Sequence, residues 1–132
     1  MSELVQVNLV TPERPYASVE AALVEVPGVQ GDFGVLPGHA PLISTIRPGV
    51  VTIHLAGGEK QRFVVLGGLA EVTFERCTIL GEYLEDVTQV SREQAAARLT
   101  DARAALDAAI GDEQKRVAER KVEVAEALAL IA

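Results

Sequence analysis

The sequence predicts an α+β protein of two domains, in which a β-sandwich of short strands precedes an antiparallel two-helix hairpin. The first observation is a change of composition near residue 88, because ten of the eleven glycines and all six prolines lie before it. The second is that residues 89–132 contain no proline and no aromatic residue, a composition typical of helices. We therefore expect one domain at residues 1–88 and another at residues 89–132.

The first domain contains short apolar runs separated by turn residues. Residues 4–10 alternate between apolar and polar with a period of two, which predicts a strand, and residues 18–26 predict a second one. Two β-rich runs flank Gly57-Gly58, a common two-residue hairpin signal. Gly67-Gly68 precedes two more predicted strands with a turn near Glu75-Arg76. Many short strands at this spacing indicate a sandwich or a flattened barrel.

The second domain carries helix start and stop signals. Ser91 followed by Gln94 predicts a capping box at the start of a helix that runs to about Ile110. Gly111 suits the left-handed position after the helix end, and Asp112 is the expected cap of a second helix. The short connection makes the two helices antiparallel neighbours.

Each predicted helix carries a narrow stripe of small apolar residues at spacings of three and four. The two stripes consist of Ala95, Leu99, Ala102, Leu106 and Ala109, and of Ala118, Val122, Ala125 and either Leu128 or Ala129. Alanine buries little area, and burial stabilises by only about 25 cal/mol per Å². We therefore expect a hairpin that is marginally stable alone and needs a surface to lie on.

Composition excludes several classes of function. The net charge of −7 argues against binding nucleic acid and against adsorption to anionic lipid. Cys77 is the single cysteine, which fits a reducing compartment. The chain lacks the run of about 18 apolar residues that a membrane span needs, and we expect no signal peptide, no lipid insertion and no cofactor.

The stretch GDFGVLPGHAPLIS, residues 31–44, contains three glycines, two prolines and one of the two histidines. Its glycines do not have the spacing of a phosphate-binding P-loop, and no lysine lies near them. His39 with Asp32 and Ser44 is one conceivable catalytic group, but a histidine that braces the loop is the more common situation. We interpret the stretch as a rigid, irregular loop that contacts another protein.

Three sequence blocks resemble a known family. They are GDFGVLPGHAPL, then IRPG and then GGLAEV, which match the approximate patterns G-[ED]-x-G-[IV]-[LY]-P-G-H-A-P-L, I-[KR]-P-G and G-G-x-x-E-V. These patterns are those of epsilon subunits of the bacterial rotary proton-translocating ATP synthase. The similarity covers most of the chain and includes the order of a glycine-rich β part and a helical hairpin.

The resemblance implies a sandwich of about ten strands and a non-catalytic place in the central stalk, where the chain binds the gamma subunit and the c-ring. The protein would couple proton-driven rotation to ATP synthesis at catalytic sites on other subunits, at the cytoplasmic face of the bacterial inner membrane. In many relatives the hairpin can also extend along gamma towards the alpha and beta subunits and block hydrolysis. The implied rotor contacts are Asp32, Phe33, Pro37, Gly38, His39, Ala40, Pro41 and Leu42.

Some relatives bind ATP through the pattern I/L-D-x-x-R-A at the start of the first helix. The matching residues are Val90, Ser91, Gln94 and Ala95, so serine replaces the aspartate and glutamine replaces the arginine. This loss removes the carboxylate and the guanidinium, the strongest charge-assisted partners of a nucleotide. We therefore predict that this protein binds ATP weakly or not at all.

Two other classes of function compete with a coupling subunit. A small-molecule sensor would close the sandwich and the hairpin on a ligand, and it would need convergent polar groups in a pocket. An enzyme would use His39 or Cys77, although a lone cysteine in a strand is more often a packing residue.

Overall fold

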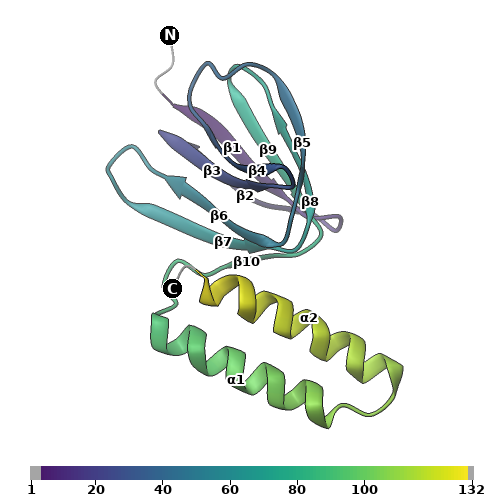
Figure 1. The fold of residues 1–132 in the computed structure, drawn as a ribbon. Coiled ribbons are helices and arrows are strands. Elements are labelled where there is room, and N and C mark those ends of the chain that lie inside the picture. The colour runs from purple at the N-terminus through teal and green to yellow at the C-terminus, as the bar shows by residue number, and fades with distance from the viewer. Residues whose placement is uncertain (1–3, 131–132) are drawn as a thin grey trace. The chain divides into compact units, whose positions relative to one another are not determined.

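The computed structural model describes residues 4–130. The chain divides into two compact units, Met1–Thr88 and Gln89–Ala132. Within the described residues, ten strands form the first unit and two antiparallel helices form the second (Figure 1). The predicted fold class, a β-sandwich followed by a helical hairpin, is therefore confirmed.

The elements follow the chain in a fixed order. They are β1 Val5–Val10, β2 Pro15–Ala21, β3 Leu23–Gly28, β4 Gly31–Val35, β5 Leu42–Ile46, β6 Gly49–His54, β7 Lys60–Val65, β8 Gly68–Val72, β9 Arg76–Gly81, β10 Leu84–Asp86, α1 Arg92–Ala108 and α2 Gly111–Ala129.

The strands form two layers that remain connected at one corner. The hydrogen-bonded order is β10-β7-β6-β3-β5-β8-β9-β1-β2, and β4 pairs with the outer edge of β3. The two layers meet between β3 and β5, which share the single register pair Gly28 and Ile46. In the second layer β1 pairs with β9, and these two strands run parallel to each other. Residues near the start of the chain therefore pair with residues some seventy positions later.

The space between the layers is filled by aliphatic side chains, as the low aromatic content predicts. In β1 the burial alternates with a period of two, so that Val5, Val7 and Leu9 point into the core. Val24, Val35, Ile53 and Ile79 are among their buried neighbours from other strands. The described residues include no buried polar or charged residue, so the burial of apolar surface stabilises the sandwich.

Two strand predictions were wrong in detail. The run 18–26 is divided at Ala22, because residues up to Ala21 pair with β1 whereas β3 pairs with β6. The amide of Ala22 donates a hydrogen bond to the carbonyl of His54 at 2.7 Å, which marks the change of partner. The stretch 31–44 is also less irregular than expected, because β4 and β5 include most of it and leave a loop at residues 36–41.

The hairpin begins as the sequence predicts. Ser91 accepts a hydrogen bond from the amide of Gln94 at 3.1 Å, and the Gln94 side chain accepts one from the amide of Ser91 at 2.9 Å. The capping box is therefore confirmed. The prediction for Asp112 was wrong, because the cap of α2 is Ile110, whose amide donates to the Gln114 side chain.

The turn between the helices places its glycine differently from the prediction. Gly111 has the expected left-handed φ of +80°, but the C-cap of α1 is Ala109, so Gly111 lies two residues beyond it and begins α2. The left-handed conformation favours glycine because a side chain there would be strained. Gly111 therefore turns the chain, while the extended backbone at Ala109 ends the first helix.

The predicted stripes include most of the buried helix residues but not all of them, because Val124 and Ala127 on α2 are buried outside the predicted stripe. On α1 the residues Ala95 and Ala102 are buried, while Leu99 and Leu106 are half-buried. On α2 the residues Ala118, Ala125 and Leu128 are buried, Val122 is half-buried and Ala129 is exposed. An ion pair between Arg103 and Glu126 at 3.8 Å also joins the helices, but both side chains are more than half exposed, so its contribution is small.

Candidate functional site

The loop at residues 36–41 is held in one shape by backbone hydrogen bonds. The amide of Gly38 donates to the carbonyl of Phe74 at 3.0 Å, and the amide of His39 donates to that of Leu36 at 3.1 Å. Gly38 has a φ of +81°, which explains the need for glycine. The loop is thereby attached to the β8–β9 turn, residues 73–75.

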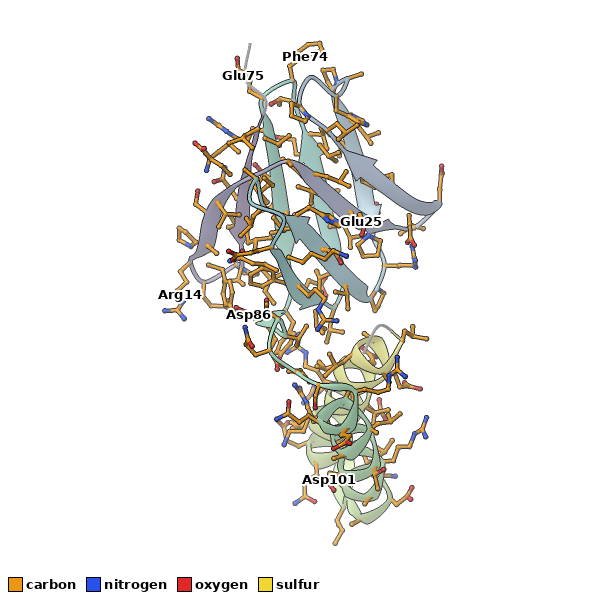
Figure 2. All side chains as sticks on the ribbon, turned by 90° about the vertical axis from the view of Figure 1, so that its left-hand side faces the viewer. Arg14, Glu25, Phe74, Glu75, Asp86 and Asp101 are labelled. Atoms are coloured by element: carbon orange, nitrogen blue, oxygen red, sulfur yellow. The ribbon has the colours of Figure 1, made fainter. Side chains whose placement is uncertain are left out.

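The attachment gathers exposed apolar side chains at one end of the sandwich. Leu36 is 57 % exposed and Phe74 is 60 % exposed, and Leu42 and Ile43 follow at the start of β5. We call these four residues the apolar cap. Figure 2 shows Phe74 and Glu75 together at this end, whereas Arg14 lies toward the opposite end of the sandwich. Exposed apolar residues that cluster are typical of a protein-docking surface.

Asp32 and Phe33 do not belong to this loop. Both lie at the beginning of β4, whereas the loop follows the end of β4. Asp32 forms an ion pair with Arg47, and the half-buried Phe33 packs against the core. The structure therefore separates the predicted rotor contacts into two groups, Asp32 with Phe33 and the loop residues from Pro37 to Leu42.

A second apolar surface lies on the outer face of the layer that contains β8, β9 and β1. Strand register places Leu69 beside Leu80, and Leu80 beside Val10. Leu80 is 43 % exposed. We call these three residues the outer apolar row. They border a shallow hollow of about 260 Å³ whose other lining residues include Gly68 and Gly81.

The outer apolar row was missed in the sequence, although a signal was present. In residues 68–81 the buried side chains are Ala70, Val72, Cys77 and Ile79. A period of two therefore assigns Leu69 and Leu80 to the outer face. Two leucines that a strand directs toward solvent indicate a contact surface, and reading the alternation residue by residue would have identified them.

A row of polar residues runs next to the outer apolar row. Register places Glu71, Thr78, Asn8 and Ser18 side by side on four neighbouring strands. The Gln6 amide group donates to the Ser18 hydroxyl at 2.6 Å, and that hydroxyl donates to Asn8 Oδ1 at 2.9 Å. An apolar row beside a hydrogen-bonding row is the usual composition of a protein interface.

The conceivable catalytic group at His39 is not assembled. His39 Nδ1 lies 2.7 Å from the carbonyl oxygen of Ala40, which can only accept, so Nδ1 carries the hydrogen. Ser44 donates to the carbonyl of Thr45 at 3.2 Å, and Asp32 accepts from Arg47. Each of the three side chains thus bonds to a different partner, and His39 braces its own loop.

Neither thiol chemistry nor a metal centre has a structural basis in the part of the chain that the structure describes. Cys77 is fully buried in the core, and burial raises the pKa of its thiol from 9.0 to about 11. The reactive thiolate is therefore disfavoured. Among residues 4–130, no group of three or more His, Cys, Asp or Glu side chains is arranged to hold a metal ion.

The degenerate nucleotide motif lies at the start of α1. Its two polar side chains, Ser91 and Gln94, bond to each other's backbone amides in the capping box. Val90 and Ala95 flank them and carry no charge. The polar side chains of the motif are thus engaged in starting the helix.

The fold defines a class of protein, a β-sandwich domain followed by a helical hairpin. Residues 4–87 match the family model for the "ATP synthase, Delta/Epsilon chain, beta-sandwich domain". The ATP synthase epsilon chain of Rhodospirillum rubrum is 43 % identical over 128 residues, which cover 97 % of this chain and 96 % of that protein. That of Paramagnetospirillum magneticum is 45 % identical over 129 residues, 98 % of this chain and 97 % of that protein. The chain belongs to the ATP synthase epsilon chain family.

Solved structures share the fold at low sequence identity. A chain of the Euglena gracilis mitochondrial ATP synthase, solved as OSCP/F1/c-ring, has a TM-score of 0.72 at 22 % identity, over 99 % of this chain and 82 % of that one. A chain of the Tetrahymena thermophila mitochondrial ATP synthase, from a central stalk/c-ring structure, has a TM-score of 0.60 at 16 % identity, over 95 % and 96 %. The arrangement of strands and helices is therefore conserved beyond the sequence.

The buried thiol predicts a loss of stability at alkaline pH. Because the pKa of Cys77 is higher in the folded than in the unfolded chain, its contribution is present below pH 9.0 and is lost as the pH rises to about 11. We expect the free energy of unfolding to fall by about 1.4 kcal/mol per pH unit from this group. Urea titrations of wild type and Cys77→Ala separate this effect from other titrating groups. The difference between their free energies of unfolding should become smaller as the pH rises from 9.0 to about 11. A constant difference, or rapid thiol labelling of the native protein at neutral pH, would contradict the prediction.

The capping box predicts no nucleotide binding. We expect no saturable NMR shift of residues 90–105 when MgATP is added to about 1 mM, a concentration that detects dissociation constants up to the millimolar range. The double variant Ser91→Asp/Gln94→Arg restores the D-x-x-R pattern and is the positive control, with an expected gain of saturable shifts. Saturable shifts in the wild-type chain would show that the serine and glutamine suffice.

Proposed function

We propose that this chain is a non-catalytic central-stalk subunit of the proton-translocating ATP synthase, which binds the gamma subunit and the c-ring and helps to couple proton-driven rotation to ATP synthesis. Relatives of 43–45 % identity over nearly the whole chain are named ATP synthase epsilon chain. The observation in this molecule that carries the proposal is its pair of exposed apolar surfaces on a rigid sandwich. Catalysis then belongs to other subunits.

The outer apolar row is the proposed gamma-binding surface. Leu69, Leu80 and Val10 present aliphatic area on a flat layer, and the adjacent hollow of about 260 Å³ is large enough to receive an aliphatic side chain. The polar row beside it supplies hydrogen-bonding groups. Through Ile43, which lies opposite Glu71 in the register, this face continues to the apolar cap, so one partner can cover both.

The predicted rotor contacts form two groups, and we propose a separate contact for each. The residues from Pro37 to Leu42, with His39 bracing them, present a fixed loop to the rotor. Asp32 and Phe33 form a separate contact on β4, where the exposed carboxylate of Asp32 offers a polar group to the c-ring loops. A peripheral position at the cytoplasmic face of the membrane follows, and no helix within residues 4–130 has the length and apolar character to span a bilayer.

The hairpin is the proposed regulatory part. Its helices meet through alanine-rich stripes, and an exposed ion pair joins Arg103 to Glu126. Each contact of these kinds contributes little free energy. When extended, it would reach the alpha and beta subunits and inhibit ATP hydrolysis. A sensor role is less well supported, because the groove of about 390 Å³ near Asp32 already has its arginine and aspartate paired with each other.

The gamma-binding surface predicts a specific binding defect. Replacing Leu80 with Gln exchanges apolar surface at the interface for an amide group that must lose its water on binding, a loss of about 1–2 kcal/mol, or about tenfold in affinity for gamma. The measurement is a titration of purified gamma with the full-length variant, with its unfolding midpoint checked in urea. Lys60→Gln, at an exposed residue of the β6–β7 hairpin, is the control and should leave the affinity unchanged. An unchanged affinity for Leu80→Gln would remove this face from the interface.

The regulatory proposal predicts the effect of a truncation. A chain ending at Thr88 keeps every residue of the sandwich core, so it should assemble into the synthase. We expect MgATP hydrolysis to rise several-fold while proton-driven synthesis is maintained. If both rates match those of synthase with the full chain, residues 89–132 do not act as a brake, and coupling resides in the sandwich alone.

A further inference from the structure

Arg47 occupies the corner at which the two layers meet. It follows Ile46, the last residue of β5 and the register partner of Gly28, and it precedes Pro48. Its backbone amide donates to the carbonyl of Pro27 at 3.0 Å, and the proline after it restricts its backbone to extended conformations. The side chain of Arg47 therefore starts from a fixed position beside the β3–β4 turn.

The guanidinium of Arg47 joins two partners that are distant in the sequence. Nη1 donates to the carbonyl oxygen of Gly28, and Nη2 donates to Oδ1 of Asp32. The turn beneath is tight, because a Cβ on Gly28 would lie 2.6 Å from the carbonyl oxygen of Gly31. One side chain thus joins the last residue of β3 to the carboxylate that follows the β3–β4 turn.

Exposure indicates that this contact contributes to geometry rather than to stability. The side chain of Arg47 is 43 % exposed and that of Asp32 is 74 % exposed, and ion pairs of this kind contribute little to folding. The carboxylate remains open to a donor from another protein while one of its oxygens is held. Glu25 and Phe33 line the same groove of about 390 Å³, so the pair lies in a concave surface.

We propose that Arg47 is a positioning residue for the rotor contact, which holds the Asp32 carboxylate and the β3–β4 turn in the orientation that the c-ring meets. This inference rests on the proposed function. Arginine suits the task because its planar fork donates along two directions at once, whereas lysine offers a point charge on a flexible chain. Arg47 acts through Asp32, so the effects of changing either residue must depend on the other.

The test is a double-mutant cycle on full-length chains that bind the complex of gamma and c-ring. Arg47→Met and Asp32→Asn should each weaken binding by about three- to tenfold, and the double variant should be no weaker than the weaker single variant. Arg47→Lys should recover part of the affinity. The control Lys60→Met makes the same change of charge on the β6–β7 hairpin and should bind like wild type, and urea unfolding should be similar for all variants.

Each outcome of the double-mutant cycle either supports or overturns the positioning role of Arg47. Unchanged binding by Arg47→Met overturns the positioning role, as do additive losses, which would mean that Arg47 contacts the partner independently of Asp32. A loss of binding that only accompanies lower stability, without rescue by lysine, also overturns it. If Asp32→Asn binds normally while Leu80→Gln does not, the Asp32 contact fails but the central-stalk function stands. If the wild-type chain does not bind the complex, the proposed function itself fails.

Discussion

The fold depends on one row of paired residues, four of them glycines, at the place where the sheet bends from one layer to the other. Register places Gly31, Gly28, Ile46, Gly68 and Gly81 side by side on five neighbouring strands. A Cβ on Gly68 would lie 1.9 Å from the carbonyl oxygen of Leu80, and its φ is +139°, so no other residue fits there without a shift of backbone. Four glycines around a single isoleucine let the strands bend sharply while their hydrogen bonds remain intact.

Both proposed contact surfaces depend on the glycines of this row. Gly68 and Gly81 leave open the hollow that Leu69 and Leu80 border, and Arg47, the residue after Ile46, donates to the carbonyl of Gly28, a position that carries no side chain. The same absence of side chains thus shapes both proposed interfaces, one apolar and one charged. Under the proposed coupling role a rigid contact surface matters, since a contact that yields under load would lose coupling.

Much of this arrangement was predictable from local sequence signals. The capping box at Ser91 and the alternation in β1 are each set by neighbouring residues. The hairpin around Gly57-Gly58 was also predictable, but its connection spans residues 55–59 rather than two residues. The division of residues 18–26 at Ala22 and the separation of Asp32 from the loop depend on which distant strands pair, and no local pattern encodes that choice. The ion pair of Asp32 and Arg47 likewise joins residues that only the fold brings together.

The sandwich and the helical hairpin are each stabilised by different contacts, and this difference is relevant to the proposed regulation. Every residue of the sandwich core cluster comes from the β-rich unit, so the sandwich does not need the helices to bury its apolar interior. The helices meet through alanine-rich stripes, and each alanine contributes little area. Under the proposed function, a rearrangement of the hairpin would leave the rotor-binding surfaces of the sandwich intact. The hairpin would then act on hydrolysis without loosening the subunit from the stalk.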